Sequence, residues 1–161
     1  ERAGDMAQLP VYVNGAAHGT GAATELVTNY NRPELDLAEE CKYVSDNLFA
    51  DAGIGPKDLD FLQIYDHVSP LVLTALEGMG VCGRGEGAAF VQGASRILVG
   101  GELPINTAGG HLGEANVQSM NHVVEAVRQL RGQAAVQIAH AKIGLVLSGN
   151  GVPSSGLILR S

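Results

Sequence analysis

Segments with the two-residue period of β-strands alternate along this chain with segments that have the 3.6-residue period of helices. This alternation is the feature that most restricts the fold. Strand-like segments are residues 9–19, 58–66, 136–151 and 154–160, helix-like segments are 33–54, 69–80 and 113–132, and loop with one short strand fills 83–110. The order βαβαβαββ predicts a layered α/β fold around a five-stranded mixed sheet, in which parallel strands are followed by an antiparallel pair.

The expected helices carry recognisable faces and ends. Apolar residues recur at helical spacing in the first and third of them: Leu37, Cys41, Val44 and Leu48, and then Val117, Met120, Val124, Val127 and Leu130. Ser69 is the expected N-cap of the second helix, because Pro70 suits the first helical position. His140 lies in an apolar strand-like run, where a core or interface position is expected.

Composition limits the class of protein. The 161 residues suffice for one domain, residues 1–161, and the net charge of −7 argues against a nucleic-acid partner. No apolar run approaches the roughly 18 residues of a membrane span. Cys41 and Cys82 form no CxxC motif, so we expect reduced thiols in a cytoplasmic protein. The chain does not begin with Met, and we expect it to be part of a longer protein.

Two polar segments follow expected strands, and the topology could bring them together. QIYDHVSP (63–70) leaves the second strand, and PINTAGGHLGEAN (104–116) leads into the third helix. Ligands of parallel α/β sheets bind beyond the carboxyl ends of the strands. We therefore expect both segments to border one site.

The first segment places Tyr65 and His67 on the same face of a strand end, with Asp66 between them. Tyrosine and histidine side chains can exchange a proton beside a carbonyl group. The alternative is structural: Tyr65 packs, Asp66 caps the next helix and His67 is solvated.

The second segment contains the glycine pair Gly109 and Gly110 after Asn106. Glycines allow the backbone to approach a ligand, and their amides could stabilise an oxyanion near a helix N-terminus. Glu114 and Asn116 lie close to the same point. The alternative is an ordinary helix entry with Glu114 in the first turn.

Other motifs are weak. HGTGAAT (18–24) lacks the GxGxxG pattern of dinucleotide sites, and Ser148 lacks the GxSxG context of a nucleophile. The histidines show no HxxxH or HExxH spacing, so the sequence predicts no metal site.

Several segments, in this order, resemble the C-terminal half of the thiolase superfamily: PVYVNG, ADAGIGPKDLDFLQIYDHVSP, GRGEGAAFVQGA, LPINTAGGHLGEAN and EAVRQLRG. The likeness is closest to the thiolase-like lipid-transfer proteins, which include sterol-carrier thiolases and steroid side-chain aldolases. It implies a βαβαβαββ half-subunit that lacks the N-terminal half with its nucleophilic cysteine. It also implies an acyl-CoA thioester as substrate, no covalently bound cofactor, and a carbon–carbon bond made or broken next to the thioester.

The resemblance assigns roles position by position. Ordinary thiolases have N-E-A-F, and sterol-carrier thiolases H-D-C-F, where this chain has Y-D-H-V. Tyr65 thus stands at the oxyanion-hole position, and His67 at the position of a motif cysteine. The general-base histidine of the G-H-P motif falls on Asn116, and His111 lies five residues too early to replace it. The C-x-G motif aligns near Ser148.

The expected catalytic residues are therefore Tyr65, His67 and Asn116, and the expected substrate-binding residues are Asp66, Gly109, Gly110, His111 and Ser148. The resemblance implies either acetyl-CoA acetyltransferase-like chemistry or retro-aldol cleavage of a bulky or steroid acyl-CoA. Because a neutral amide does not titrate usefully, Asn116 cannot replace the thiolase base, which favours the retro-aldol reaction. The isolated chain would then be inactive. The alternative is a non-catalytic acyl-CoA-binding or scaffolding homologue. The family also implies a homodimer and a partner built from a zinc ribbon and an OB-fold.

Overall fold

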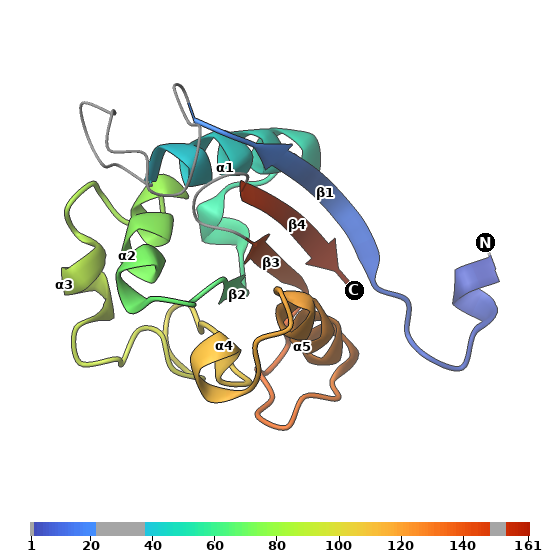
Figure 1. Ribbon diagram of the computed structural model, residues 1–161. Coiled ribbons are helices and arrows are strands. Elements are labelled where there is room, and N and C mark those ends of the chain that lie inside the picture. The colour runs from blue at the N-terminus through green and yellow to red at the C-terminus, as the bar shows by residue number, and fades with distance from the viewer. Residues whose placement is uncertain (1, 22–37, 149–153) are drawn as a thin grey trace.

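The computed structural model describes residues 2–21, 38–148 and 154–161, and in them four strands and five helices follow the order β1-α1-β2-α2-α3-α4-α5-β3-β4 (Figure 1). The strands are β1 (Tyr12–Gly19), β2 (Phe61–Ile64), β3 (Ile143–Ser148) and β4 (Ser154–Arg160). The helices are α1 (Ala38–Ala52), α2 (Ser69–Gly78), α3 (Gly87–Val91), α4 (Gly110–Gly113) and α5 (Met120–Arg131), with 3₁₀ turns at Arg2–Asp5 and Pro56–Asp58. The layered α/β class predicted from the sequence is confirmed. No helix in the described ranges is long and apolar enough to cross a membrane.

The sheet has the strand order β1-β4-β3-β2, in which β2 is parallel to β3 and the other neighbours are antiparallel. The mixed sheet is confirmed, but the prediction of five strands is wrong. On the outer side of β2, the described residues add one isolated parallel bridge, between Leu62 and Ile105. Asn106 then turns away with φ of 49°, and its side chain bonds both the amide (2.7 Å) and the carbonyl (2.9 Å) of Ile64. A side-chain amide thus replaces the backbone pairing that would extend a fifth strand.

Helices α1 and α2 cover one face of the sheet and α5 covers the other (Figure 1). Cys41, Val44 and Leu48 form the inner face of α1 and are fully buried, as their spacing predicts. Leu37 lies outside the described residues. On the opposite face, Phe61 and Val146 pack against Ala126 and Leu130 of α5. Each face of the sheet therefore has its own apolar core.

Two local predictions are wrong by a few residues. Ser69 is the first residue of α2, and Val68 holds the N-cap position without a side-chain cap. The strand predicted from residue 136 begins at Ile143, so that His140 lies exposed in the preceding loop instead of in the core.

Helix α5 differs most from its prediction. It begins at Met120, because Gln118 and Ser119 have positive φ angles of 54° and 69° and separate it from α4. Met120 and Val124 of the predicted buried stripe are exposed. The buried face instead consists of Asn121, His122, Glu125, Ala126, Gln129 and Leu130. A buried helix face with this many polar groups needs hydrogen-bond partners, and those partners form the centre of the site described next.

Candidate functional site

The two polar segments meet beyond the carboxyl end of β2, as the topology predicts. The amide of Tyr65 continues the ladder by donating to the carbonyl of Leu147 at 3.0 Å. The Tyr65 ring lies between two imidazoles, with centroid distances of 4.7 Å to His67 and 4.3 Å to His111. The ring of His111 continues to that of His122 at 4.8 Å. Four rings, from the segment after β2, from α4 and from α5, therefore form one continuous row.

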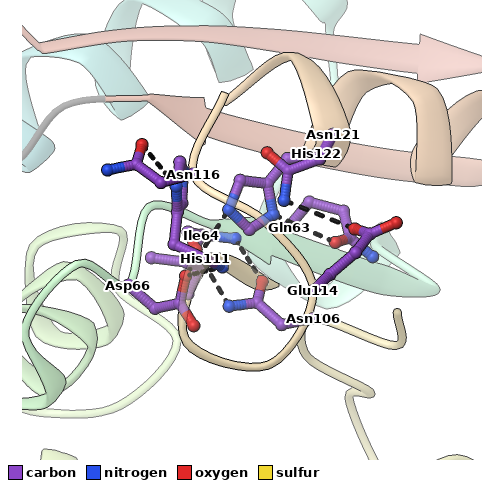
Figure 2. A network of polar contacts seen from close by, with 9 residues as sticks. All are labelled: Gln63, Ile64, Asp66, Asn106, His111, Glu114, Asn116, Asn121 and His122. Atoms are coloured by element: carbon purple, nitrogen blue, oxygen red, sulfur yellow. Dashed lines mark hydrogen bonds and ion pairs between the residues drawn. The ribbon is translucent and has the colours of Figure 1, made fainter. Parts of the chain in front are cut away.

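Asp66 joins the two segments. Its carboxylate is buried, and Oδ1 accepts a hydrogen bond of 2.7 Å from the amide of His111 (Figure 2). Gly110 has φ of +64°, and a Cβ atom there would collide with the Asp66 carboxylate. We expected Gly110 to let a ligand approach the backbone. In this structure the group that lies against the backbone at Gly110 is the carboxylate of Asp66.

Asn116 faces His111. Nδ1 of His111 lies 3.1 Å from Oδ1 of Asn116. Because a carboxamide oxygen only accepts hydrogen bonds, Nδ1 of His111 carries a hydrogen, and in the neutral form of the ring the lone pair is on Nε2. Glu114, in the same loop, accepts from Asn121 at 3.4 Å.

A buried relay fixes the tautomer of His122. The hydroxyl of Thr107 has a single hydrogen, which it donates to Oε1 of Glu125 at 2.6 Å. Thr107 Oγ1 must therefore accept from Nε2 of Gln63, at 3.2 Å. This orients Gln63 so that its Oε1 faces Nδ1 of His122 at 3.3 Å. Nδ1 of His122 consequently donates, and its Nε2 carries a lone pair.

His122 is neutral at physiological pH. It is 1% exposed, and burial, together with the neighbouring His111, lowers its pKa to about 4. Asp66 and Glu114 act in the opposite direction, but more weakly. Nε2 of His122 lies 3.6 Å from Oδ1 of Asp66 (Figure 2). This contact therefore joins a lone pair to a carboxylate rather than a cation to an anion.

Ser148 ends β3, directly after Leu147, whose carbonyl accepts the hydrogen bond from the amide of Tyr65. It lines a groove of about 480 Å³ between the sheet and the beginning of α5. The lining is mostly small or apolar: Ala16, Ala17, His18, Gln118, Ser119, Met120, Val123, Val146, Ser148, Ser155, Gly156 and Leu157. Of the aligned C-x-G positions after Ser148, Gly149 and Asn150 lie outside the described residues.

Comparison with known proteins assigns the chain to a family. Residues 19–159 match the family described as thiolase C-terminal domain-like. The chain belongs to this family. The likeness to the branch that includes steroid side-chain aldolases is also confirmed. This thiolase C-terminal-like domain is 45% identical over 158 residues to the 17-hydroxy-3-oxo-4-pregnene-20-carboxyl-CoA lyase of Mycobacterium tuberculosis. It is 43% identical over 159 residues to the steroid side-chain-cleaving aldolase of Thermomonospora curvata.

A solved structure of the Ltp2-ChsH2(DUF35) aldolase superimposes on this thiolase C-terminal-like domain with a TM-score of 0.94 and 42% identity. The matches cover 98%, 99% and 99% of the domain, but only 41%, 40% and 42% of the two relatives and of the solved chain. The domain thus spans about two fifths of the length of the proteins that it resembles.

Sequence reasoning missed the inner part of the site. His122, Gln63 and Thr107 come from α5, β2 and the loop before α4, and no motif links them. One signal was available: in the buried part of α5 the residues Asn121, Glu125 and Gln129 repeat every four positions, which marks a polar helix face.

Proposed function

We propose that this domain forms the C-terminal part of the active site of an enzyme that cleaves a carbon–carbon bond next to a coenzyme A thioester by a retro-aldol reaction. The observation that carries the proposal is the position of Tyr65, at the end of β2 with its ring between those of His67 and His111. The relatives named as a lyase and a side-chain-cleaving aldolase support this reaction class.

Retro-aldol cleavage needs a base for the β-hydroxyl proton and a group that stabilises the developing enolate. As the hydroxyl loses its proton, a carbonyl forms at the β-carbon and the Cα–Cβ bond breaks. The bonding electrons pass to the thioester as an enolate, which then takes up a proton at Cα. Tyr65 and His67 are the two groups that we assign to this proton exchange, because both can donate and accept hydrogens. His111, oriented by Asn116, supports the Tyr65 ring.

We propose a coenzyme A thioester with a bulky, steroid-like acyl group as the substrate. The name of the mycobacterial relative specifies such a thioester with a hydroxyl group on the steroid. No covalently bound cofactor is needed for this chemistry, because the thioester itself stabilises the enolate.

The domain needs further protein to complete such a site. We propose a thiolase N-terminal-type half in the same longer protein, assembly into homodimers, and a partner with a zinc ribbon and an OB-fold. The matched share of the relatives, about two fifths, supports a missing half. The groove beside α5 is a mostly apolar surface on which that half would pack.

A second function has its own supporting observation. Asn116 stands where the family has a titratable residue, and its amide oxygen is engaged by His111. A protein that binds acyl-CoA without cleaving it would tolerate this substitution.

The test is cleavage of a 17-hydroxy-steroid 20-carboxyl-CoA thioester by the complete protein with any partner that it requires. We expect Tyr65→Phe to lower the cleavage rate by roughly 10²-fold or more, since general acid–base groups contribute about 10²–10⁴. Tyr43→Phe, at a half-exposed tyrosine on α1, is the matched control and should leave the rate unchanged. Thioester binding without turnover, insensitive to Tyr65→Phe, would instead establish the binding function.

A further inference from the structure

Three side chains that are distant in the sequence present metal-ligating atoms to one another. Asp66 follows β2, His111 lies in α4 and His122 lies in α5, and one ligand atom from each falls within 4.8 Å of the others. We propose that Asp66, His111 and His122 bind a divalent transition-metal ion, with Zn²⁺ as the best match. The proposal goes beyond the proposed reaction, because metal binding is measured without substrate.

The contact between His122 and Asp66 is the first reason. The relay from Glu125 through Thr107 and Gln63 places the hydrogen of His122 on Nδ1, so Nε2 and Oδ1 of Asp66 are two acceptors 3.6 Å apart. Two facing acceptors repel unless a cation or a proton lies between them. Nε2 of His122 is buried and has no hydrogen-bond partner among the described residues.

His111, like His122, has one ring nitrogen in a hydrogen bond and the other without a hydrogen-bond partner among the described residues. Its Nδ1 donates to Oδ1 of Asn116, and its Nε2 is also buried without a hydrogen-bond partner in the described part of the chain. Histidines that bind metals donate their other ring N–H to an oxygen, which fixes the tautomer and the ring orientation. Gln63 and Asn116 supply these oxygens for His122 and His111. Both imidazoles are thus held in the tautomer that a metal needs.

The ligand set suits zinc. Zn²⁺ binds histidine nitrogen and carboxylate oxygen at about 2.0–2.2 Å, so the ligand atoms of a tetrahedral site lie about 3.4 Å apart. The 3.6 Å between His122 and Asp66 is close to this distance. The wider spacing, up to 4.8 Å, would contract by movement of His111, which is only partly buried on the four-residue α4. Three protein ligands leave one position for water or an oxygen ligand.

Two of the three ligand side chains, Asp66 and His122, are held firmly. Asp66 is fixed by the amide of His111 and by contact with Gly110. His122 lies on α5, whose polar face is hydrogen-bonded to Gln63 and Thr107. Preorganised ligands of this kind lose little freedom on binding an ion.

The experiment is a zinc titration of the 161-residue chain, without a histidine tag and after chelator treatment, against a fluorescent zinc indicator. We expect one Zn²⁺ per chain, and a Co²⁺-loaded sample with visible d–d absorption. His111→Gln, Asp66→Asn and His122→Gln should each weaken the affinity by roughly tenfold or more. His140→Gln, at the exposed histidine before β3, is the matched control and should retain full affinity.

Folding is checked separately, because His122→Gln removes a buried group. Zn²⁺ should raise the melting temperature of the unsubstituted chain and of His140→Gln, but not that of a folded His111→Gln variant. Absence of zinc binding, or equal binding by folded His111→Gln, overturns the proposal. So does a ¹⁵N NMR spectrum in which Nε2 of His122 carries a hydrogen that saturating Zn²⁺ does not displace. None of these results depends on cleavage of a thioester, so the proposed reaction stands or falls separately.

Discussion

Asp66 occupies the space in which a Cβ atom at residue 110 would lie, so the carboxylate after β2 and the backbone of α4 are in direct contact. The amide of His111 donates to the same carboxylate at 2.7 Å. The absence of a side chain at Gly110 is therefore what allows the two site segments to join. The row of rings from His67 to His122 depends on this junction, because α4 carries His111.

We predict that Gly110→Ala destabilises the domain far more than Gly132→Ala. Both glycines have positive φ, +64° and +69°, and alanine in this region costs about 1–2 kcal/mol. A Cβ atom at residue 132 meets nothing within 4 Å, whereas one at residue 110 collides with Asp66. Gly110→Ala should therefore lower the free energy of unfolding by roughly 3 kcal/mol or more. Urea denaturation of both variants measures the difference, and equal losses would show that the contact with Asp66 is not tight.

Thr107 should be the centre of the buried relay. Thr107→Val keeps the shape but leaves Gln63, Gln129 and Glu125 without their shared partner, at a cost of about 1–3 kcal/mol. It should also release Gln63, so that His122 samples both neutral tautomers. ¹⁵N NMR of the imidazole reads the tautomer, and thermal unfolding reads the stability.

The matched control for this change is Thr74→Val, whose hydroxyl only donates to the carbonyl of Leu71 one turn earlier in α2. It should cost less and leave the His122 spectrum unchanged. A Thr107→Val spectrum in which His122 still carries its hydrogen on Nδ1 alone would show that Gln63 does not set the tautomer.

The sequence predicts those parts of the fold in which burial and hydrophobicity coincide. Cys41, Val44 and Leu48 are apolar, periodic and fully buried, so α1 could be placed with its inner face correctly. In α5 the two properties separate: Met120 and Val124 are exposed while His122 and Glu125 are buried. A search for an apolar stripe selects the wrong face of such a helix, because polar groups can be buried when their hydrogen bonds are complete.

The outer part of the site could also be predicted. Tyr65, His67 and the 104–116 segment meet because parallel strands place their carboxyl ends at one edge. The inner part could not be predicted, since the partners of His122 come from β2 and from the loop before α4, and only the folded backbone aligns them. The missing fifth strand has a similar cause. Whether the side chain of Asn106 or a backbone pair bonds Ile64 is decided by the positive φ of Asn106.

Cys82 should react slowly with alkylating agents near neutral pH. Burial, followed by the charges of Glu77 and Glu86, raises the pKa of its thiol, so the reactive thiolate is scarcer than in a free cysteine at the same pH. Glu86→Gln removes one of these charges and should speed alkylation by roughly twofold to tenfold, whereas Asp46→Asn on α1 should not. Mass spectrometry at pH 7 to 9 measures the rates. Cys41, which is fully buried, is the internal reference and should stay unmodified. A rate unchanged by Glu86→Gln would mean that the charge of Glu86 does not affect the thiol pKa.

The exposed apolar residues of α5 should make the isolated chain associate. Met120 and Val124 are 59% and 42% exposed, and Met120 lines the groove between α5 and the sheet. Apolar surface of this kind is normally covered by a partner. Sedimentation velocity should show association that rises with concentration and that Met120→Glu or Val124→Glu weakens. Val136→Glu, at a residue 52% exposed beyond the opposite end of α5, adds the same charge elsewhere and should have little effect. If all three variants weaken association equally, net charge rather than this face controls it. In a longer protein whose other half covers the groove, Met120→Glu should instead lower thermal stability, because the added carboxylate would be buried without a partner.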